Sequence, residues 1–291
     1  MTMWNDPDVR GTLLVVASAV AFSTAGLFTR LIALDTWTIL FWRGLFAGLF
    51  IAAYVAWTQG SRSFAALRAI GPAGLLAAAC STLASVCFIE ALRLASVAEV
   101  MVIGATTPFV AAGLTWMCTG RRERPATLVV SAVAVIGVAA MFGGESSSGQ
   151  VTGGLLALAM TALLSAMMVI IRARSGTSML PASCLSAFAC SVVALPVMAP
   201  GWPAAADLVL LFLFGTIQFG LGLLLMTIGA RSISATRSAL AGTLDVPLAP
   251  VWVWLAMGDT PPLMTCVGGT IVMVAVVAEV AWRPTKIRDG G

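Results

Sequence analysis

Long apolar runs, separated by charged residues, prolines or glycines, follow one another along the whole sequence. A helix needs about 20 mostly apolar residues to cross a bilayer. Ten runs reach roughly that length, at residues 11–30, 36–57, 70–91, 97–118, 125–143, 152–171, 180–199, 207–229, 236–257 and 262–282. The sequence therefore predicts an all-α polytopic membrane protein with ten transmembrane helices.

Charged residues are too few to cover the water-facing surface of a soluble chain of this length. They make up 10% of the 291 residues, whereas a soluble domain has about 25%. The six cysteines form no CxxC pair and no histidine is present. We therefore interpret the cysteines as packing residues and expect no metal site. We also expect a lipid bilayer around the chain, no cofactor and no nucleic-acid partner.

Basic residues gather in alternate loops, which indicates the orientation, because Lys and Arg are enriched on the cytoplasmic side of membrane proteins. With the N-terminus in the cytoplasm, all of the 16 Lys and Arg residues except Arg30, Arg43 and Arg93 lie in cytoplasmic segments. No loop is long enough to form a domain outside the membrane. We therefore expect a multi-pass protein of the bacterial inner (plasma) membrane with both termini cytoplasmic.

The two halves of the chain resemble each other. Residues 91–108 align without a gap on residues 230–247. Apolar helices can align by chance, but matched Ser, Arg and Pro residues at nearly constant spacing favour a true duplication. Each unit holds five predicted helices, and an odd number makes the second copy enter the membrane from the opposite side, as an inverted repeat. The expected five-helix repeats are residues 1–146 and 147–291, which together form one membrane domain.

Several motifs carry a resemblance to a known family: Ala21-Phe22-Ser23-Thr24, Phe41-Trp42-Arg43, Ala91-Leu92-Arg93 with Ser96 ahead of Pro108, and Gly120-x-x-Glu123. With the duplicated unit, they make the whole chain similar to the EamA family of the drug/metabolite transporter superfamily. Residues 99–108 also resemble the YddG-type amino-acid exporters of that family. The resemblance implies a secondary transporter that exports amino acids or related small metabolites. The chain departs from the family at Phe22, where Trp is common, and the second copy has no counterpart of Arg43.

Two prolines occupy equivalent depths near the middle of the fourth and ninth predicted helices, Pro108 and Pro247. Proline lacks an amide and frees the carbonyl four residues before it, here those of Gly104 and Thr243. Freed carbonyls at mid-membrane are tolerated where they line a site or a water-filled cavity. We expect both prolines to line the substrate site, and an ordinary kink is the alternative.

Ionisable residues in or near the spans are candidate binding groups, because a charge in the bilayer must face a partner or water. Arg43 is predicted to hold a substrate carboxylate with its planar fork, or else to pair with Glu99 or Asp35. Asp245, the deepest acid, could receive a substrate ammonium or a coupling proton, or be satisfied by Thr243 or nearby backbone. Glu99 could instead sit at the membrane interface.

Polar and aromatic residues of the spans complete the expected site. We predict a cavity lined by Phe22, Ser23, Thr24, Trp42, Ser81, Ser85, Thr106, Thr107, Ser165, Gln218 and Phe219. Small and polar residues also hold membrane helices together, so we expect about half of this set to contact the solute.

Three functions are compatible with such a chain. The first is secondary transport of a small-molecule substrate, an amino acid or metabolite, by a monomer or homodimer. A lipid or lipid-precursor flippase of the same architecture is an alternative. An intramembrane enzyme is disfavoured, because the chain has no histidine and no GxSxG, Walker or paired-aspartate motif. We therefore expect no catalytic residue.

Overall fold

The computed structural model describes residues 7–60, 71–119, 129, 132–133, 136–137, 148–173, 179–230, 232–233, 241–242, 244–261 and 263–282. Within these ranges the chain forms helices joined by short turns, and no strand is present. In chain order the helices are α1 (Pro7–Ser23), α2 (Ala25–Leu31), α3 (Thr36–Gln59), α5 (Gly71–Leu94), α6 (Val97–Ala105), α7 (Thr107–Thr119), α9 (Ser148–Ala173), α10 (Met179–Ala194), α11 (Ala205–Leu213), the π-helix η3 (Phe214–Leu221), α12 (Gly222–Gly229), α14 (Asp245–Met257) and α15 (Leu263–Trp282).

Five helical segments of the described chain are long and apolar enough to cross a membrane: Asp8–Leu31, Thr36–Thr58, Gly71–Leu94, Ser148–Ile170 and Ala205–Gly229. The bent pair of α6 and α7 makes a sixth if it is one span. Three shorter apolar helices are Leu180–Ala194, Asp245–Met257 and Leu263–Ala275. The prediction of an all-α, multi-pass membrane protein is confirmed, whereas the number of ten spans stays a prediction.

Two predicted helix ends are wrong for physical reasons. The first helix begins at Pro7 and not at residue 11, because proline is well tolerated in the first turn, where its missing amide has no helical partner. The predicted helix 180–199 ends at Ala194. It stops there because Pro196 cannot donate the amide that the next turn needs.

Two other predicted helices are only partly described. The ninth, 236–257, is described at residues 241–242 and again from Leu244, and its α14 portion begins at Asp245. The fifth, 125–143, lies mostly outside the described residues. Their predicted lengths are therefore not tested.

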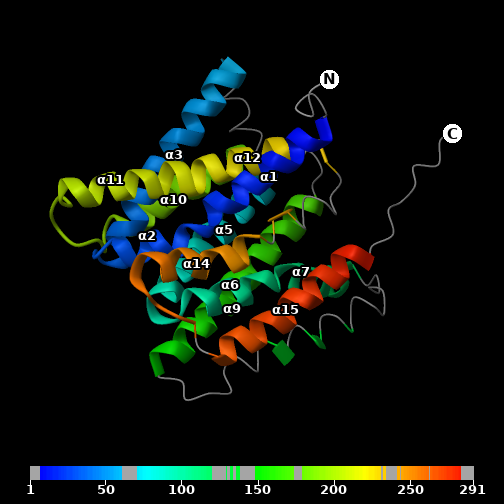
Figure 1. Cartoon of the computed structure of the whole chain (residues 1–291). Helices are drawn as coiled ribbons and strands as arrows, with labels where there is room; N and C mark the ends of the chain where they lie inside the picture. Colours follow the sequence, from blue (N-terminus) through cyan, green and yellow to red (C-terminus); the bar gives the residue numbers. More distant parts are fainter. Residues whose placement is uncertain are drawn as a thin grey trace, which may run out of the picture.

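Helices from the two halves of the chain pack against one another (Figure 1). α3 packs along α10, α5 along α9 and α1 along α12, and α14 lies against α1, α2 and α6. The start of α1 and the end of α15 lie on the same side of the bundle, at the right of the view. The largest buried cluster joins these helices through side chains such as Leu40, Leu92, Ile103, Phe214 and Val253. The interface between the halves is therefore the apolar core.

α3 and α10 approach each other to backbone contact at Gly44. A Cβ atom added there would lie 2.6 Å from the Ala187 carbonyl oxygen and 2.7 Å from Ser191 Oγ. Ser191 holds the same contact from the other helix, because its hydroxyl donates to the Phe41 carbonyl at 2.8 Å. Small residues allow such close packing between membrane helices. A larger residue at position 44 would have to move a backbone.

We predict that Gly44→Ala lowers the free energy of unfolding by about 1–3 kcal/mol, the usual cost of overpacking a tight contact. Thermal unfolding of the purified protein in detergent, followed by tryptophan fluorescence, measures the change. Gly113→Ala is the matched control, because nothing lies within 4 Å of the position that its Cβ would take. An equal loss of stability in the control would contradict this account.

α3 begins at a side-chain cap made by Asp35. Its Oδ2 accepts a hydrogen bond from the Thr38 amide at 3.0 Å, and its Oδ1 accepts one from the Thr38 hydroxyl at 2.6 Å. Partial burial opposes ionisation of this carboxyl group, but the hydrogen bonds outweigh it and hold the pKa of Asp35 below its usual value. Asp35 thus helps to start α3, and it is not the partner of Arg43, whose described hydrogen bond goes to Gln218.

Asp35→Ala should lower the free energy of unfolding by about 1 kcal/mol at neutral pH, as loss of such a cap does. Because the folded pKa is depressed, this stabilisation is present above the usual carboxyl pKa and is lost as the pH falls through the folded pKa. Unfolding temperatures of the parent and Asp35→Ala, measured from neutral to acid pH, should therefore converge.

Asp35→Asn is the control for this prediction, because asparagine caps a helix without titrating. Its advantage over Asp35→Ala should not change with pH. A gap between the parent and Asp35→Ala that also stays constant at acid pH would contradict the assignment of the cap.

Candidate functional site

The first membrane helix is interrupted at Thr24, between α1 and α2. The hydroxyl of Ser23 donates to the Val20 carbonyl at 2.7 Å, and that of Thr24 donates to the Ala21 carbonyl at 2.6 Å. Ser23 Oγ also accepts a hydrogen bond from Trp252 Nε1 of α14 at 2.8 Å. Ser23 therefore ties the broken helix of the first half to a helix of the second half.

Arg43 is buried inside the bundle, with 6% of its surface exposed. Its Nη2 donates to Gln218 Oε1 at 3.3 Å. Its Cζ lies 4.8 Å from the ring centre of Phe214 and 4.9 Å from that of Phe219. Its Nε has no hydrogen-bond partner, and no carboxylate of the described residues pairs with it. An amide and two aromatic rings therefore hold the cation, with one donor left unused.

Gln218 belongs to η3, an eight-residue π-helix between α11 and α12. Its Nε2 donates to the Phe22 carbonyl at 3.4 Å, while its Oε1 accepts from Arg43. Gly215 lets the same π-helix touch α3, since a Cβ there would lie 2.6 Å from the Arg43 carbonyl oxygen. π-Helical turns occur frequently at functional sites. We name this group of residues the Arg43 centre: Phe22, Arg43, Phe214, Gln218 and Phe219.

Four members of the Arg43 centre are predicted from the sequence as site residues, and Phe214 is not. A phenylalanine in an apolar span looks like any packing residue, so no local signal marks it. Its spacing of four residues from Gln218 is a signal that could have placed both on one helix face. The structure therefore groups Phe22, Arg43, Gln218 and Phe219, which the sequence predicts only as separate lining residues.

Trp42, the neighbour of Arg43 on α3, is also buried, and its Nε1 has no hydrogen-bond partner. Its ring packs edge-on against Phe41 and tilted against Trp202, with ring centres 5.3 and 5.2 Å apart. Two consecutive residues of α3 therefore each carry a buried donor that the described residues leave unpaired.

α6 and α7 meet at Thr106 with a bend of 42°. The Thr106 hydroxyl donates to the Ile103 carbonyl at 2.6 Å, and the Thr107 hydroxyl donates to the Gly104 carbonyl at 2.5 Å. Ser165 Oγ of α9 donates to the Thr107 carbonyl at 3.0 Å. The Gly104 carbonyl, which Pro108 is predicted to free from its helical hydrogen bond, therefore accepts one from a neighbouring hydroxyl instead.

The two aligned prolines begin helices instead of interrupting them. Pro108 is the second residue of α7, and Pro247 is the third residue of α14 and is exposed. A proline in the first turn loses no helical hydrogen bond, because the first amides have no partner inside the helix. The break lies at Thr106 ahead of Pro108 and at Leu244 ahead of Pro247, so each proline follows a break in its predicted span, and its role in lining a site stays a prediction. Thr243, the other carbonyl that the sequence singles out, lies outside the described residues.

Asp245 is the first residue of α14 and is half-buried. Its carboxylate lies beside its own backbone amide and that of Val246, where the helix dipole favours a negative charge. Within the described part of the chain it forms no ion pair with Arg43. The two charges that the sequence predicts for a zwitterion are therefore not paired with each other.

Three further predicted site residues lie on α5 and α6. Glu99 and Ser96 form a capping box, in which Glu99 Oε2 accepts from the Ser96 amide at 3.0 Å and Ser96 Oγ accepts from the Glu99 amide at 3.2 Å. Glu99 Oε1 accepts from Gln150 Nε2 of α9 at 2.6 Å. Glu99 therefore joins helices and is not the partner of the buried arginine. Ser81 and Ser85 are half-buried on α5.

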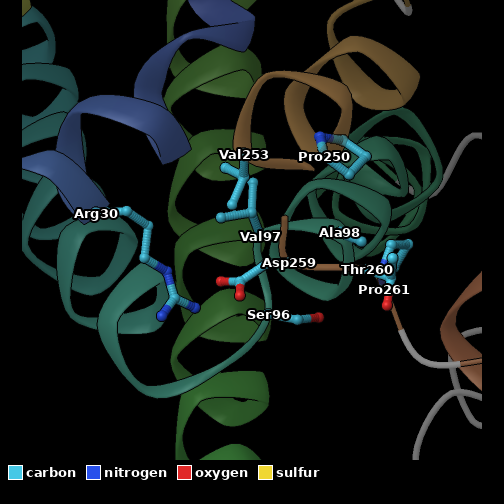
Figure 2. Close-up of a pocket in the computed structure, with 9 residues that line it drawn as sticks. All are labelled: Arg30, Ser96, Val97, Ala98, Pro250, Val253, Asp259, Thr260 and Pro261. Carbon is cyan, nitrogen blue, oxygen red and sulfur yellow. The ribbon is translucent and has the colours of Figure 1, made fainter. Parts of the chain in front are cut away.

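A shallow cleft with a volume of about 50 Å³ opens where α2 and the start of α6 face the end of α14 (Figure 2). Its lining residues are Arg30, Ser96, Val97, Ala98, Pro250, Val253, Asp259, Thr260 and Pro261. Figure 2 shows the Arg30 guanidinium and the Asp259 carboxylate directed toward each other across it. Sequence analysis names neither as a site residue, although Arg30 is marked as one of the three basic residues outside the cytoplasmic segments.

We predict that Gln218→Ala lowers the free energy of unfolding by about 1.5–3 kcal/mol, because it removes a hydrogen bond to a buried charged group. Thermal unfolding in detergent measures the change. Thr216→Val is the control on the same π-helix, since the Thr216 hydroxyl donates only to the Phe212 carbonyl. A loss in Gln218→Ala no larger than that in Thr216→Val would show that the amide does not hold Arg43.

Comparison with known proteins bears on the first half of the chain and on the fold. Residues 9–143 match the EamA-like transporter family, which belongs to the drug/metabolite transporter superfamily. A solved crystal structure of a protein has a similar fold, with a TM-score of 0.66 and 18% sequence identity over 94% of this chain and 96% of that one. No curated protein matches this sequence. Residues 9–143 are therefore similar to a family of small-molecule membrane transporters, as the motifs of that half predict.

Proposed function

We propose that this chain is a secondary transporter that exports amino acids or related small metabolites across the bacterial inner membrane. In this proposal ten helices form two inverted five-helix repeats, residues 1–146 and 147–291, with both termini in the cytoplasm. The similarity of residues 9–143 to EamA-like transporters supports the transport of small molecules. The similarity of fold to a solved structure over nearly the whole chain supports a single membrane domain.

Helix packing supports the repeat. In the predicted repeat, α9 is the counterpart of α1, α5 of α12, and α7 of α14. α1 packs on α12, and α9 packs on α5; likewise α14 packs on α1, and α7 packs on α9. These contacts are related by exchange of the two halves, as two related five-helix units require. The aligned segments 91–108 and 230–247 also each contain a break, at Thr106 in the first and at Leu244, the counterpart of Ala105, in the second. A transporter that opens alternately to two sides is commonly built from two such halves.

The observation that carries the substrate proposal is the burial of Arg43 without an acid. Burying a guanidinium is costly unless charged or hydrogen-bonding groups surround it. Here Gln218 supplies one neutral acceptor, and Nε stays unpaired. A solute carboxylate would accept hydrogen bonds from the planar guanidinium of Arg43 and so supply the acceptors that the protein does not. We therefore assign carboxylate recognition to the Arg43 centre.

Asp245 is proposed to receive the solute ammonium or a coupling proton. It begins α14, directly after the turn at Leu244. Transporter sites gather at such interrupted helices near the interface of two repeats, and α14 packs against α1, α2 and α6 of the first half. With an acid at this place, the second half would bind the solute ammonium through Asp245, and the first half would bind the solute carboxylate through Arg43.

Gln218→Glu tests the role of the Arg43 centre, because it places a carboxylate where the amide stands. The new ion pair should raise the unfolding temperature. It should also lower amino-acid transport in proteoliposomes roughly tenfold or more, because it occupies the cation that the solute needs. A stabilised variant that transports at the parental rate would show that Arg43 has a structural role only.

Two further variants complete this test. Arg43→Lys keeps the charge but loses the fork, and Asp245→Asn removes the acid, so both should impair amino-acid transport while leaving membrane insertion intact. Uptake of each of the twenty amino acids by proteoliposomes measures the effect. Thr58→Ala, at an exposed position of α3, is the control. Parental rates in both variants would assign recognition to backbone groups near the broken helices.

A further inference from the structure

We propose that the cleft between Arg30 and Asp259 is a second solute site, which binds a small zwitterion with an apolar side chain, such as a neutral amino acid. The proposal rests on the proposed function for its choice of solute. The cleft is shallow: its cavity volume of about 50 Å³ is well below the ~300–1,000 Å³ of enclosed small-molecule sites. It therefore suits a small solute that binds at the surface through its charged end.

The charges on the two sides of the cleft are opposite in sign and are not joined. Arg30 is held in place by its Nη2, which donates to the Ala95 carbonyl at 3.1 Å. Asp259 follows Gly258, whose left-handed backbone, with φ of 76°, ends α14. Both side chains are exposed and point toward each other (Figure 2), yet no ion pair joins them in the described chain. The carboxylate and ammonium of one solute would each find an opposite charge here.

Between these charges the cleft has apolar walls. Val97 of α6 and Val253 of α14 are buried, and Ala98 and Pro250 lie beside them in the lining. An apolar side chain placed against these walls would leave water, which is favourable. A charged side chain would lose its hydration without gaining a further partner. The cleft therefore suits a neutral amino acid better than an acidic or basic one.

Each half of the chain supplies one charge. Arg30 lies near the end of α2, which approaches the start of α6 closely at one point, where a Cβ added to Gly26 would meet Val97 Cγ1. α2 and the start of α6 line one side of the cleft, and the end of α14 lines the other. Arg30 also lies at the end of the Asp8–Leu31 span, and the start of α1 lies at the opposite end of that span. With a cytoplasmic N-terminus, the cleft opens at the face where an exported solute leaves.

Isothermal titration of the full-length protein in lipid nanodiscs tests the site with three ligands that share a branched apolar chain. L-Leucine carries both charges, 4-methylpentanoate carries only the carboxylate, and 3-methylbutylamine carries only the ammonium. Titrations are done in the parent and in the Gln218→Glu variant, where Arg43 is paired and its centre no longer contributes. We expect leucine to bind roughly tenfold or more tightly than either analogue in both backgrounds.

Neutral variants of the two charges identify the site. Arg30→Gln should weaken leucine binding to the level of 3-methylbutylamine, and Asp259→Asn to that of 4-methylpentanoate. Arg93→Gln is the matched control, because Arg93 is exposed and donates to the Leu34 carbonyl but does not line the cleft. The proposal is overturned if leucine does not bind, if both cleft variants keep the parental affinity, or if leucine and 4-methylpentanoate bind equally.

Failure of the proposed function gives a different result from failure of this inference. If the parent transports no amino acid while the titrations behave as expected, the cleft stands and the export proposal falls. If the parent transports leucine while Arg30→Gln and Asp259→Asn bind it as the parent does, export stands and the cleft proposal falls.

Discussion

Every hydrogen-bonding group inside this bundle has to find a protein partner, because lipid offers none. Where the membrane helices break, hydroxyl groups supply those partners. Thr24 bonds the Ala21 carbonyl, Thr106 bonds the Ile103 carbonyl, and Ser165 bonds a third carbonyl from a neighbouring helix. The breaks are therefore stable features of the fold. They set the directions of α2 and α7 and bring the ends of short helices to the interface between the halves.

The same constraint makes the surroundings of Arg43 unusual. The two acids that could have paired with it are engaged at helix starts, Asp35 at α3 and Glu99 at α6. Arg43 is left with the Gln218 amide, two aromatic rings and an unpaired Nε. At the cleft, by contrast, Arg30 faces an acid across open space. The two sites proposed for a solute carboxylate thus differ in their surroundings, one in the interior and one at the surface.

The predictions from sequence succeed where one residue type stands out against its surroundings and fail where geometry assigns the partner. Arg43 and Gln218 are polar residues in apolar runs, so both are recognisable as candidates. The capping roles of Asp35 and Glu99 depend on where α3 and α6 begin, which the apolar runs place only roughly. Pro108 is predicted to interrupt its helix, but only the structure places the break two residues earlier, at Thr106, so that Pro108 lies in the first turn of α7.

The sequence by itself determined an all-helical membrane protein with an EamA-like first half, because apolar runs and short motifs are local properties that survive in any packing. Only the tertiary structure decided which of its polar residues meet. Arg43 and Gln218 are 175 positions apart, and they touch because Gly215 allows the π-helix to reach the α3 backbone. Arg30 and Asp259 face each other (Figure 2) because α2 and α14 end at the same side of the bundle (Figure 1). Such pairings follow from helix packing and helix ends, which the order of residues in one span does not specify.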